Sequence, residues 1–409
     1  MAAVIKKVWG QVIHDSRGDD TVQATVQDEM GGTASAAVPG SGGSKGSFEA
    51  ATVEAPLAVE NITQHIEPVL LGKDPANQSE LDRVMIELDG TASKAKLGSN
   101  AILAVSMALS RLAANNAKLP LYRYIGALDG REGFTVPIPM MNLINGGKHA
   151  HNNLDIQEFM VVPDALRGYH NQLSAGKLIF STLGTILREE NHTITTGDEG
   201  GYAPNLDTNE IAFDYLVRAI KQSGYKTWEE VSLAVDVAAS SLPPTFEVTP
   251  TRYMGLLHDF PILSLEDPFG EDDWPQWIAF LQEMEQSNPT TKKLMLVGDD
   301  LFVTNPERLK RGIEQRAANS ILLKLNQIGT VSETIAVAQV AHQAGFITIM
   351  SHRSGETLDD FIADFAVGIG CQFIKTGAPN DAHPERMTKY RRLLSIEQEL
   401  TANDARQPA

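Results

Sequence analysis

The chain has 409 residues, a net charge of −18 and one cysteine, Cys371. This length allows two domains with a large core. The acidic balance disfavours binding to nucleic acids and to anionic membranes, because their phosphates repel it. One cysteine permits no internal disulfide, which fits a reducing compartment, and no long apolar run indicates a signal peptide or a membrane span. We therefore expect a cytoplasmic protein without a membrane span.

The first part of the chain reads as strands followed by helices. Over residues 3–38, apolar and polar side chains alternate in three short runs, which predicts strands. After a glycine-rich stretch, apolar residues recur at helical spacing in three segments, the last of which ends at residue 116. This order is typical of an α+β unit. We place that domain at residues 1–125 and a turn-rich linker at residues 126–135.

From residue 136 to residue 409 the pattern changes. Two adjacent strand-like runs, 136–144 and 156–163, are followed by two helical stretches, and then strands and helices alternate. Repeated units of roughly 30 residues are typical of a (β/α)8 barrel, which needs about 250 residues. The predicted fold is therefore α/β, with a C-terminal barrel that begins irregularly as ββαα and an N-terminal α+β capping domain.

Three of the predicted buried strands end on a carboxylate, at Asp236, Glu266 and Asp299. Buried carboxylates without a partner are costly, and three close together repel one another. Either each has its own local partner or a cation lies between them. Oxygen ligands of this kind suit Mg²⁺, and the sequence holds no cluster of cysteine and histidine of the zinc type. The favoured interpretation is a divalent metal site.

In such barrels the catalytic groups lie at the C-terminal ends of the strands. Polar residues are predicted there in strand after strand, namely Glu158, Glu199, Asp236, Glu266, Asp299, Lys324, His352 and Lys375. Any one of them alone reads as a salt bridge or a helix cap. The whole set at one end of a barrel predicts an active site.

One side of this predicted site is basic. Lys324, Lys375 and Arg353 would surround an anionic substrate, and Arg353 can bind phosphate or carboxylate with two parallel hydrogen bonds. A partly desolvated lysine crowded by cations has a lowered pKa and can act as a base. The chemistry that this combination favours is removal of a proton next to a carboxylate, since the enediolate that results needs positive charge.

Long motifs extend this interpretation over nearly the whole chain. They include "HDSRG", "SGGSKG", "MMNLINGGKHAHNNLDIQEFM", "TTGDEGGYAPN", "SLEDPFGEDDW", "GDDLFVTNP" and "SHRSGETLDDFIADFAVG", in this order. The chain therefore resembles the enolase family, bacterial-type, with a shortened N-terminal domain. The resemblance implies a hydro-lyase that reversibly dehydrates 2-phospho-D-glycerate to phosphoenolpyruvate in glycolysis and gluconeogenesis. It also implies a homo-oligomer, at least a dimer.

The resemblance implies a metal role for four positions. Asp236, Glu266 and Asp299 match the ligands of a tightly bound Mg²⁺. Ser41 resembles the loop serine that helps to bind a second Mg²⁺ recruited with substrate.

The remaining matches concern proton transfer and substrate binding. Lys324 matches the base that removes the α-proton, and Glu199 matches the acid that protonates the departing hydroxide, supported by Glu158. His149 matches a residue of a closing loop. The substrate contacts implied are Gln157, His352, Arg353, Ser354 and Lys375.

Some positions depart from the family pattern. The first loop has an additional Gly40 and Lys45 in place of threonine, and the segment after Ala50 is shortened. These departures keep one alternative open, a divergent enolase acting on a related phosphonate or hydroxy acid. Another barrel of the superfamily, such as a sugar-acid dehydratase, shares the three carboxylates, but "SHRSGE" with "GDEGGYAP" argues against it. A non-catalytic surface-binding role is a further alternative, with location at the cell surface or secretion without a signal peptide.

Overall fold

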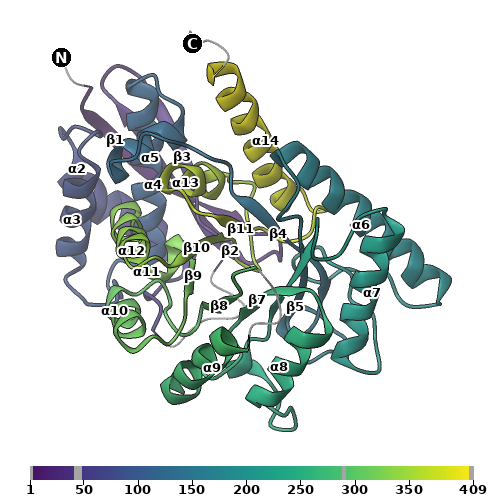
Figure 1. The fold of residues 1–409 in the computed structure, drawn as a ribbon. Coiled ribbons are helices and arrows are strands. Elements are labelled where there is room, and N and C mark those ends of the chain that lie inside the picture. The colour runs from purple at the N-terminus through teal and green to yellow at the C-terminus, as the bar shows by residue number, and fades with distance from the viewer. Residues whose placement is uncertain (1–2, 41–47, 288–291, 405–409) are drawn as a thin grey trace.

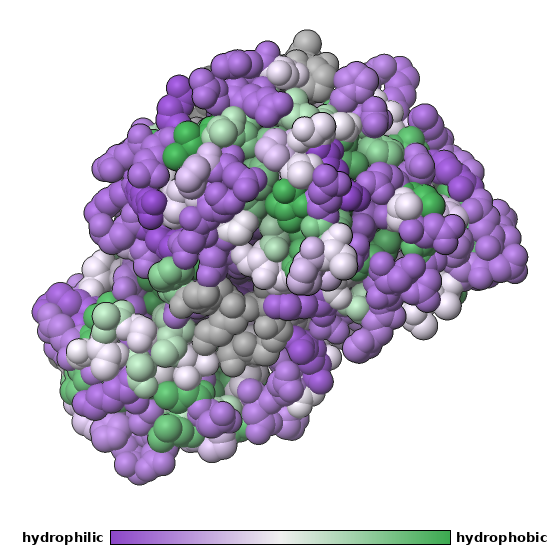
Figure 2. All heavy atoms as spheres, turned by 90° about the horizontal axis from the view of Figure 1, so that it is seen from below, coloured by the Kyte–Doolittle hydropathy of each residue, from purple (hydrophilic) through white to green (hydrophobic). Residues whose placement is uncertain are grey.

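The computed structural model describes residues 3–40, 48–287 and 292–404. Figure 1 shows a three-stranded sheet with its helices on one side of a closed eight-stranded barrel. Among the described residues, none of the helices combines the length and the apolar character needed to cross a membrane. The face shown in Figure 2 is mostly hydrophilic, with apolar residues in small separate groups.

The N-terminal unit is an antiparallel sheet covered by helices. Its three strands, which the sequence predicted, are β1 (Ile5–His14), β2 (Asp20–Asp28) and β3 (Thr33–Ala37), and they pair in chain order. Against them packs α4 (Ser99–Asn116), which is buried along almost its whole length. The other helices are α1 (Ala55–Asn61), the π turn η1 (Ile62–Ile66), α2 (Glu67–Leu70) and α3 (Gln78–Asp89).

Helix α5 (Leu121–Asp129) crosses the boundary that the sequence suggested at residue 125. Its buried side, with Tyr122 and Ile125, packs against α13 (Phe361–Ile369) of the barrel. A Cβ on Gly368 would lie 2.6 Å from Ile125, so the two helices approach closely through this glycine. The first residues of the predicted linker are therefore helical, and the exact division into domains stays a prediction.

The barrel is closed, and one of its strands runs against the others. The strands are β4 (Ile138–Asn145), β5 (Glu158–Val162), β6 (Ser232–Asp236), β7 (Ile262–Glu266), β8 (Met295–Gly298), β9 (Ser320–Leu323), β10 (Ile347–Ser351) and β11 (Phe373–Lys375). β5 is antiparallel to both neighbours, and the other adjacent pairs are parallel. Helices α6 (Tyr169–Glu189) and α7 (Asn209–Gln222) follow, which confirms the predicted ββαα start.

Further helices surround the barrel, and its interior is packed. They are α8 (Pro250–Asp259), α9 (Trp274–Gln286), α10 (Pro306–Gln315), α11 (Leu325–Ile328), α12 (Val331–Gln343) and α14 (Pro384–Asp404). Asn305 and Thr330 cap α10 and α12 by accepting hydrogen bonds from their first-turn N–H groups. Inside the barrel, apolar side chains such as Met140, Leu322 and Ile349 form a buried cluster. The charged side chains of the barrel strands lie at strand ends, namely Glu158, Asp236, Glu266 and Lys375.

Candidate active site

The strand-end prediction holds for six of the eight residues and is wrong for two. Asp236, Glu266 and Lys375 end their strands, and Asp299, Lys324 and His352 directly follow theirs. In contrast, Glu158 begins β5. Because β5 runs in the opposite direction, Glu158 pairs with Asp236 at the same end of the barrel. Glu199 does not end a strand at all, since it lies in the loop between α6 and α7.

The predicted residues converge on one small cavity at this end. Its lining comprises His149, Gln157, Glu158, Glu199, Asp236, Asp299, Lys324, Ser351, His352, Arg353, Ser354 and Lys375. Glu266 is buried beside it, with Oε2 2.9 Å from Lys375 Nζ. Ser41 and Lys45 lie outside the described residues. The sequence therefore identified most of the described lining, and Ser351 is an addition.

Two of the carboxyl groups in the cavity, those of Glu158 and Glu199, lie around His149. His149 Nδ1 lies 3.6 Å from Glu158 Oε1 and 3.5 Å from Glu199 Oε1. Asn142 Nδ2 donates to Glu199 Oε2 over 3.0 Å, a contact that the sequence did not reveal. Burial and the charge of Glu199 raise the pKa of Glu158 well above its usual range. Burial also acts to raise the pKa of Glu199, but contacts with His352 and His149 lower it well below the usual range.

Lys375 forms ion pairs with three of the buried carboxylates. Its Nζ lies 3.1 Å from Glu158 Oε1, 3.2 Å from Asp236 Oδ2 and 2.9 Å from Glu266 Oε2. Burial acts to lower the pKa of Lys375, but the carboxylates, Asp236 first, raise it well above the usual range. The lysine is therefore a charged partner shared by several carboxylates. Gln157 Nε2 adds a hydrogen bond to Asp236 over 3.2 Å.

Lys324 pairs with the third strand-end carboxylate, which overturns one expectation. The ammonium contacts Asp299 Oδ2, and Gln327 Nε2 donates to Asp299 Oδ1 over 2.8 Å. Burial acts to lower the pKa of Lys324, but Asp299 outweighs it and raises the pKa. The lowered pKa expected for a lysine crowded by cations is therefore not found for Lys324 in the protein alone, because the ion pair with Asp299 favours the charged form.

Asp267 belongs to the acidic site, although the sequence analysis did not select it. It is 3% exposed, and its oxygens accept hydrogen bonds from the backbone N–H groups of Asp299 (3.1 Å) and Asp300 (2.7 Å). Oxygens of Glu266, Asp267 and Asp299 lie within 4.8 Å of one another. The consecutive acids in "LED" and "GDD" were a signal for it.

Comparison with known proteins decides the family. The model of the enolase N-terminal domain matches residues 5–125, and that of the enolase C-terminal TIM barrel domain matches residues 133–245 and 245–407. A relative from Beutenbergia cavernae, named enolase, is 43% identical over 422 aligned positions, which cover 97% of this chain and 96% of the relative. This chain belongs to the enolase family. It is a hydro-lyase of the phosphopyruvate hydratase type, and the alternatives drawn from the sequence find no support.

Enolase membership implies a divalent metal, and the strand ends fit one. At the strand ends there are more buried carboxylates than lysines. As a result, burial and the charge of Asp236 raise the pKa of Glu266 to about 8, and burial and the charge of Asp299 raise that of Asp300 to about 7. A hard cation with oxygen ligands would relieve this repulsion. Asp236, Glu266 and Asp299, with Asp267 beside them, are the residues that would hold it.

The candidate phosphate-binding residues contact residues of the N-terminal unit. Glu49 accepts two hydrogen bonds from Arg353, at 3.1 Å each, and Arg17 NH1 donates to Ser354 Oγ over 3.3 Å. Both contacts join segments that are distant in sequence. The N-terminal unit of the enolase therefore contributes to the site directly.

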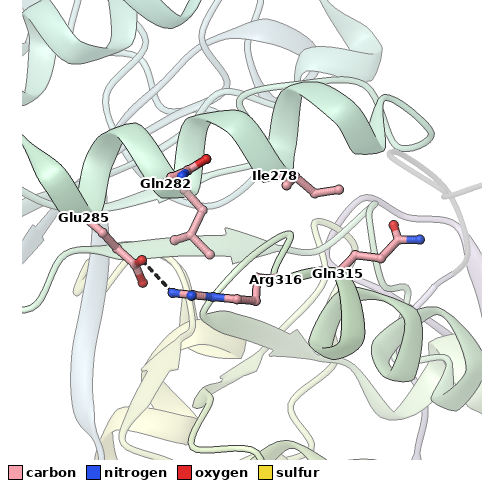
Figure 3. A pocket seen from close by; sticks show the side chains of 6 residues that line it. Ile278, Gln282, Glu285, Gln315 and Arg316 are labelled. Carbon is pink, nitrogen blue, oxygen red and sulfur yellow. Dashed lines mark hydrogen bonds and ion pairs between the residues drawn. The ribbon is translucent and has the colours of Figure 1, made fainter.

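A second hollow, between α9 and the end of α10, has none of these properties (Figure 3). Ile278, Gln282 and Glu285 line it from α9, with Gln315 and Arg316 opposite. Arg316 pairs with Glu285 over 2.8 Å, and both are exposed. The cavity at the strand ends is therefore the candidate active site of the enolase.

Proposed function

We propose that this chain converts 2-phospho-D-glycerate reversibly to phosphoenolpyruvate with Mg²⁺, one ion held by Asp236, Glu266 and Asp299 and a second recruited with substrate through Ser41. The observation that supports the proposal is one cavity with two lysines and an arginine beside a pair of carboxyl groups with opposite pKa shifts. Separate groups for removing and donating a proton are what the elimination of water requires.

Lys324 removes the α-proton of the substrate in this proposal. When bound, Mg²⁺ would neutralise the carboxylates and stabilise negative charge that develops on the substrate carboxylate. With Asp299 engaged as a metal ligand, its ion pair with Lys324 would weaken, and Lys324 could then lose a proton and act as the base. Lys375 lies beside the substrate carboxylate and contributes a second fixed positive charge to the enediolate.

Glu199 then protonates the hydroxide that leaves. The pKa of Glu158 is raised well above its usual range and that of Glu199 is lowered well below it, so Glu158 is the member of the pair that favours the protonated form. Glu158 can therefore supply the proton that Glu199 passes on. The buried Oε1 of Gln157 and Oε2 of Glu158 accept no hydrogen bond from the described residues, so they are available to substrate hydroxyl groups.

Substrate binding falls to the remaining groups. Arg353 and Ser354 bind the phosphate, with His149 and His352 nearby. We also infer a cytoplasmic homodimer from the family, and light scattering of the purified protein would test that state.

The test separates the two proton transfers. Lys324→Ala should lose both dehydration and exchange of the α-proton with solvent deuterium. Glu199→Gln should lose dehydration by about 10²- to 10⁴-fold, the usual contribution of a general acid, and keep the exchange. Dehydration is followed by the ultraviolet absorbance of the enol product, and exchange by NMR. Exchange that survives in Lys324→Ala would contradict the assignment of the base.

A further inference from the structure

Arg386, near the start of α14, joins the loop of Glu199 to the loop that follows β10. Its side chain is fully buried, with 0% exposed. Its terminal N–H groups reach Nδ1 of His352 (2.6 Å) and the carbonyl oxygens of Arg353 (2.6 Å), Ser354 (2.5 Å) and Asp198 (3.0 Å). All four terminal N–H groups thus have acceptors on the two loops that carry candidate site residues.

The contact with His352 determines which ring nitrogen carries the proton. A guanidinium group has donors only and stays charged, so Nδ1 of His352 must accept the hydrogen bond from Arg386. The proton of the neutral ring is then on Nε2, which lies 3.3 Å from Glu199 Oε1. His352 therefore carries an N–H group, and no free lone pair, on the ring nitrogen that lies near Glu199.

The environment of His352 favours this neutral form. The ring is 2% exposed. Burial lowers its pKa to about 4, because the opposing effect of Glu199 is partly offset by the charge of Arg386. Protonation of Nδ1 would also bring two N–H groups together at 2.6 Å.

We propose that Arg386 is a positioning residue that holds His352 as the Nε2–H tautomer, so that the imidazole orients Glu199 and cannot take its proton. The proton needed by the leaving hydroxide then stays on the carboxyl pair formed by Glu158 and Glu199. This inference rests on the proposed role of Glu199 as the acid. The tautomer itself can be measured without any reaction.

The first experiment determines the tautomer in the complete enzyme. We expect NMR of protein with ¹⁵N-labelled histidine to show an unprotonated Nδ1 and a protonated Nε2 for His352 at neutral pH. The signal is assigned by its loss in His352→Gln. A protonated Nδ1 in the unsubstituted enzyme would overturn the inference whether or not Glu199 is the acid.

The second experiment compares two substitutions at the same position. Arg386→Met removes the donor to Nδ1, and we expect a loss of dehydration of roughly 10- to 100-fold, the range for a partner that orients a functional side chain. Exchange of the α-proton should persist. Arg386→Lys keeps one donor and should recover much of the dehydration.

A matched control lies on the same helix. Arg391→Met makes the same change at a side chain that is 63% exposed, and it should leave both rates unchanged. If exchange falls together with dehydration in Arg386→Met, or if Arg386→Lys is no better than Arg386→Met, the residue has a structural role only and the inference fails.

Discussion

Gly40 departs from the family pattern, and close packing explains why it has no side chain. A Cβ at this position would lie 2.1 Å from Oδ2 of Asp15. Asp15 cannot turn away easily, because its Oδ1 accepts hydrogen bonds from the backbone N–H groups of Arg17 and Asp19 at 2.9 Å each. Gly40 N also donates to the carbonyl of Gly355, next to Ser354, over 3.1 Å. The absence of a methyl group here thus lets the N-terminal unit contact the loop that carries Arg353 and Ser354.

We predict that Gly40→Ala weakens substrate binding and lowers stability. The added methyl group must displace the Asp15 carboxylate or the loop at Gly355, and overpacking of this kind costs about 1–3 kcal/mol. Steady-state kinetics should show a raised KM, and thermal unfolding a lowered Tm. Gly133→Ala is the control, since nothing lies within 4 Å of its Cβ position. Equal behaviour of the two variants would refute the packing argument.

At the scale of elements, the direction of β5 decides how the acidic part of the site is built. The alternation of side chains along a strand is the same in either direction, so the sequence could predict the strand and not its orientation. The connection from β4 was the available signal, since it holds only the three-residue helix η2 (Gly147–His149) and a parallel crossover usually contains a longer helix. Asp267, Asn142 and Arg386 were missed because their partners are distant in the sequence: Asp299 for Asp267, Glu199 for Asn142 and the loop after β10 for Arg386.

Asp267 offers a test of the strand ends. Asp267→Asn replaces one acceptor oxygen with an NH₂ group facing the backbone N–H of Asp299 or Asp300. We expect the Mg²⁺ concentration for half-maximal activity to rise by about 10- to 100-fold, as for partners that orient metal ligands. Asp272→Asn, at a side chain 63% exposed, is the control. If the Mg²⁺ dependence of Asp267→Asn is unchanged, Asp267 has no role in the metal site.

The pKa of Glu266 predicts how the effect of Mg²⁺ varies with pH. Burial and Asp236 raise this pKa from 4.5 to about 8, so in the protein without metal the protonated form stabilises the fold below pH 4.5. That contribution is lost as the pH rises toward 8, because the folded state then holds a proton that the unfolded state has released. Bound Mg²⁺ would stabilise the ionised form. The increase in Tm caused by Mg²⁺ should therefore be larger at pH 8 than at pH 5.5, and the reverse order would contradict the shift.

Ion pairs join the N-terminal unit to the barrel. Arg111 on α4 donates to Asp359 over 2.9 Å and 2.6 Å and to Asp360 over 2.9 Å. Lys94 contacts Glu333 at 2.9 Å. These pairs connect residues more than 200 positions apart, and the sequence gives no direct sign of such partners. The hydrophobic periodicity predicted the elements, and the contacts between distant charges could be known only from the structure.

We predict that Arg111→Met strongly destabilises the enzyme. Asp359 is buried, and removing one partner of a buried ion pair costs about 3–5 kcal/mol. Denaturant unfolding measures the loss. Arg83→Met removes an exposed pair with Glu87, 61% exposed on each side, and should cost less than about 1 kcal/mol. If the free energy of unfolding falls by similar amounts in the two variants, the ion pair at Asp359 stabilises the fold no more than an exposed pair does.

The contacts of Lys375 indicate that the chain can fold before it binds a metal ion. An ammonium group of the chain already lies among Glu158, Asp236 and Glu266, so the barrel can close before any ion arrives. Chelator should therefore abolish turnover while circular dichroism stays unchanged, and added Mg²⁺ should restore activity without refolding. With the proposed Mg²⁺ as the metal, its binding would be a reversible step after folding, and the active fraction of the enzyme should follow the free Mg²⁺ concentration without destruction or resynthesis of the protein.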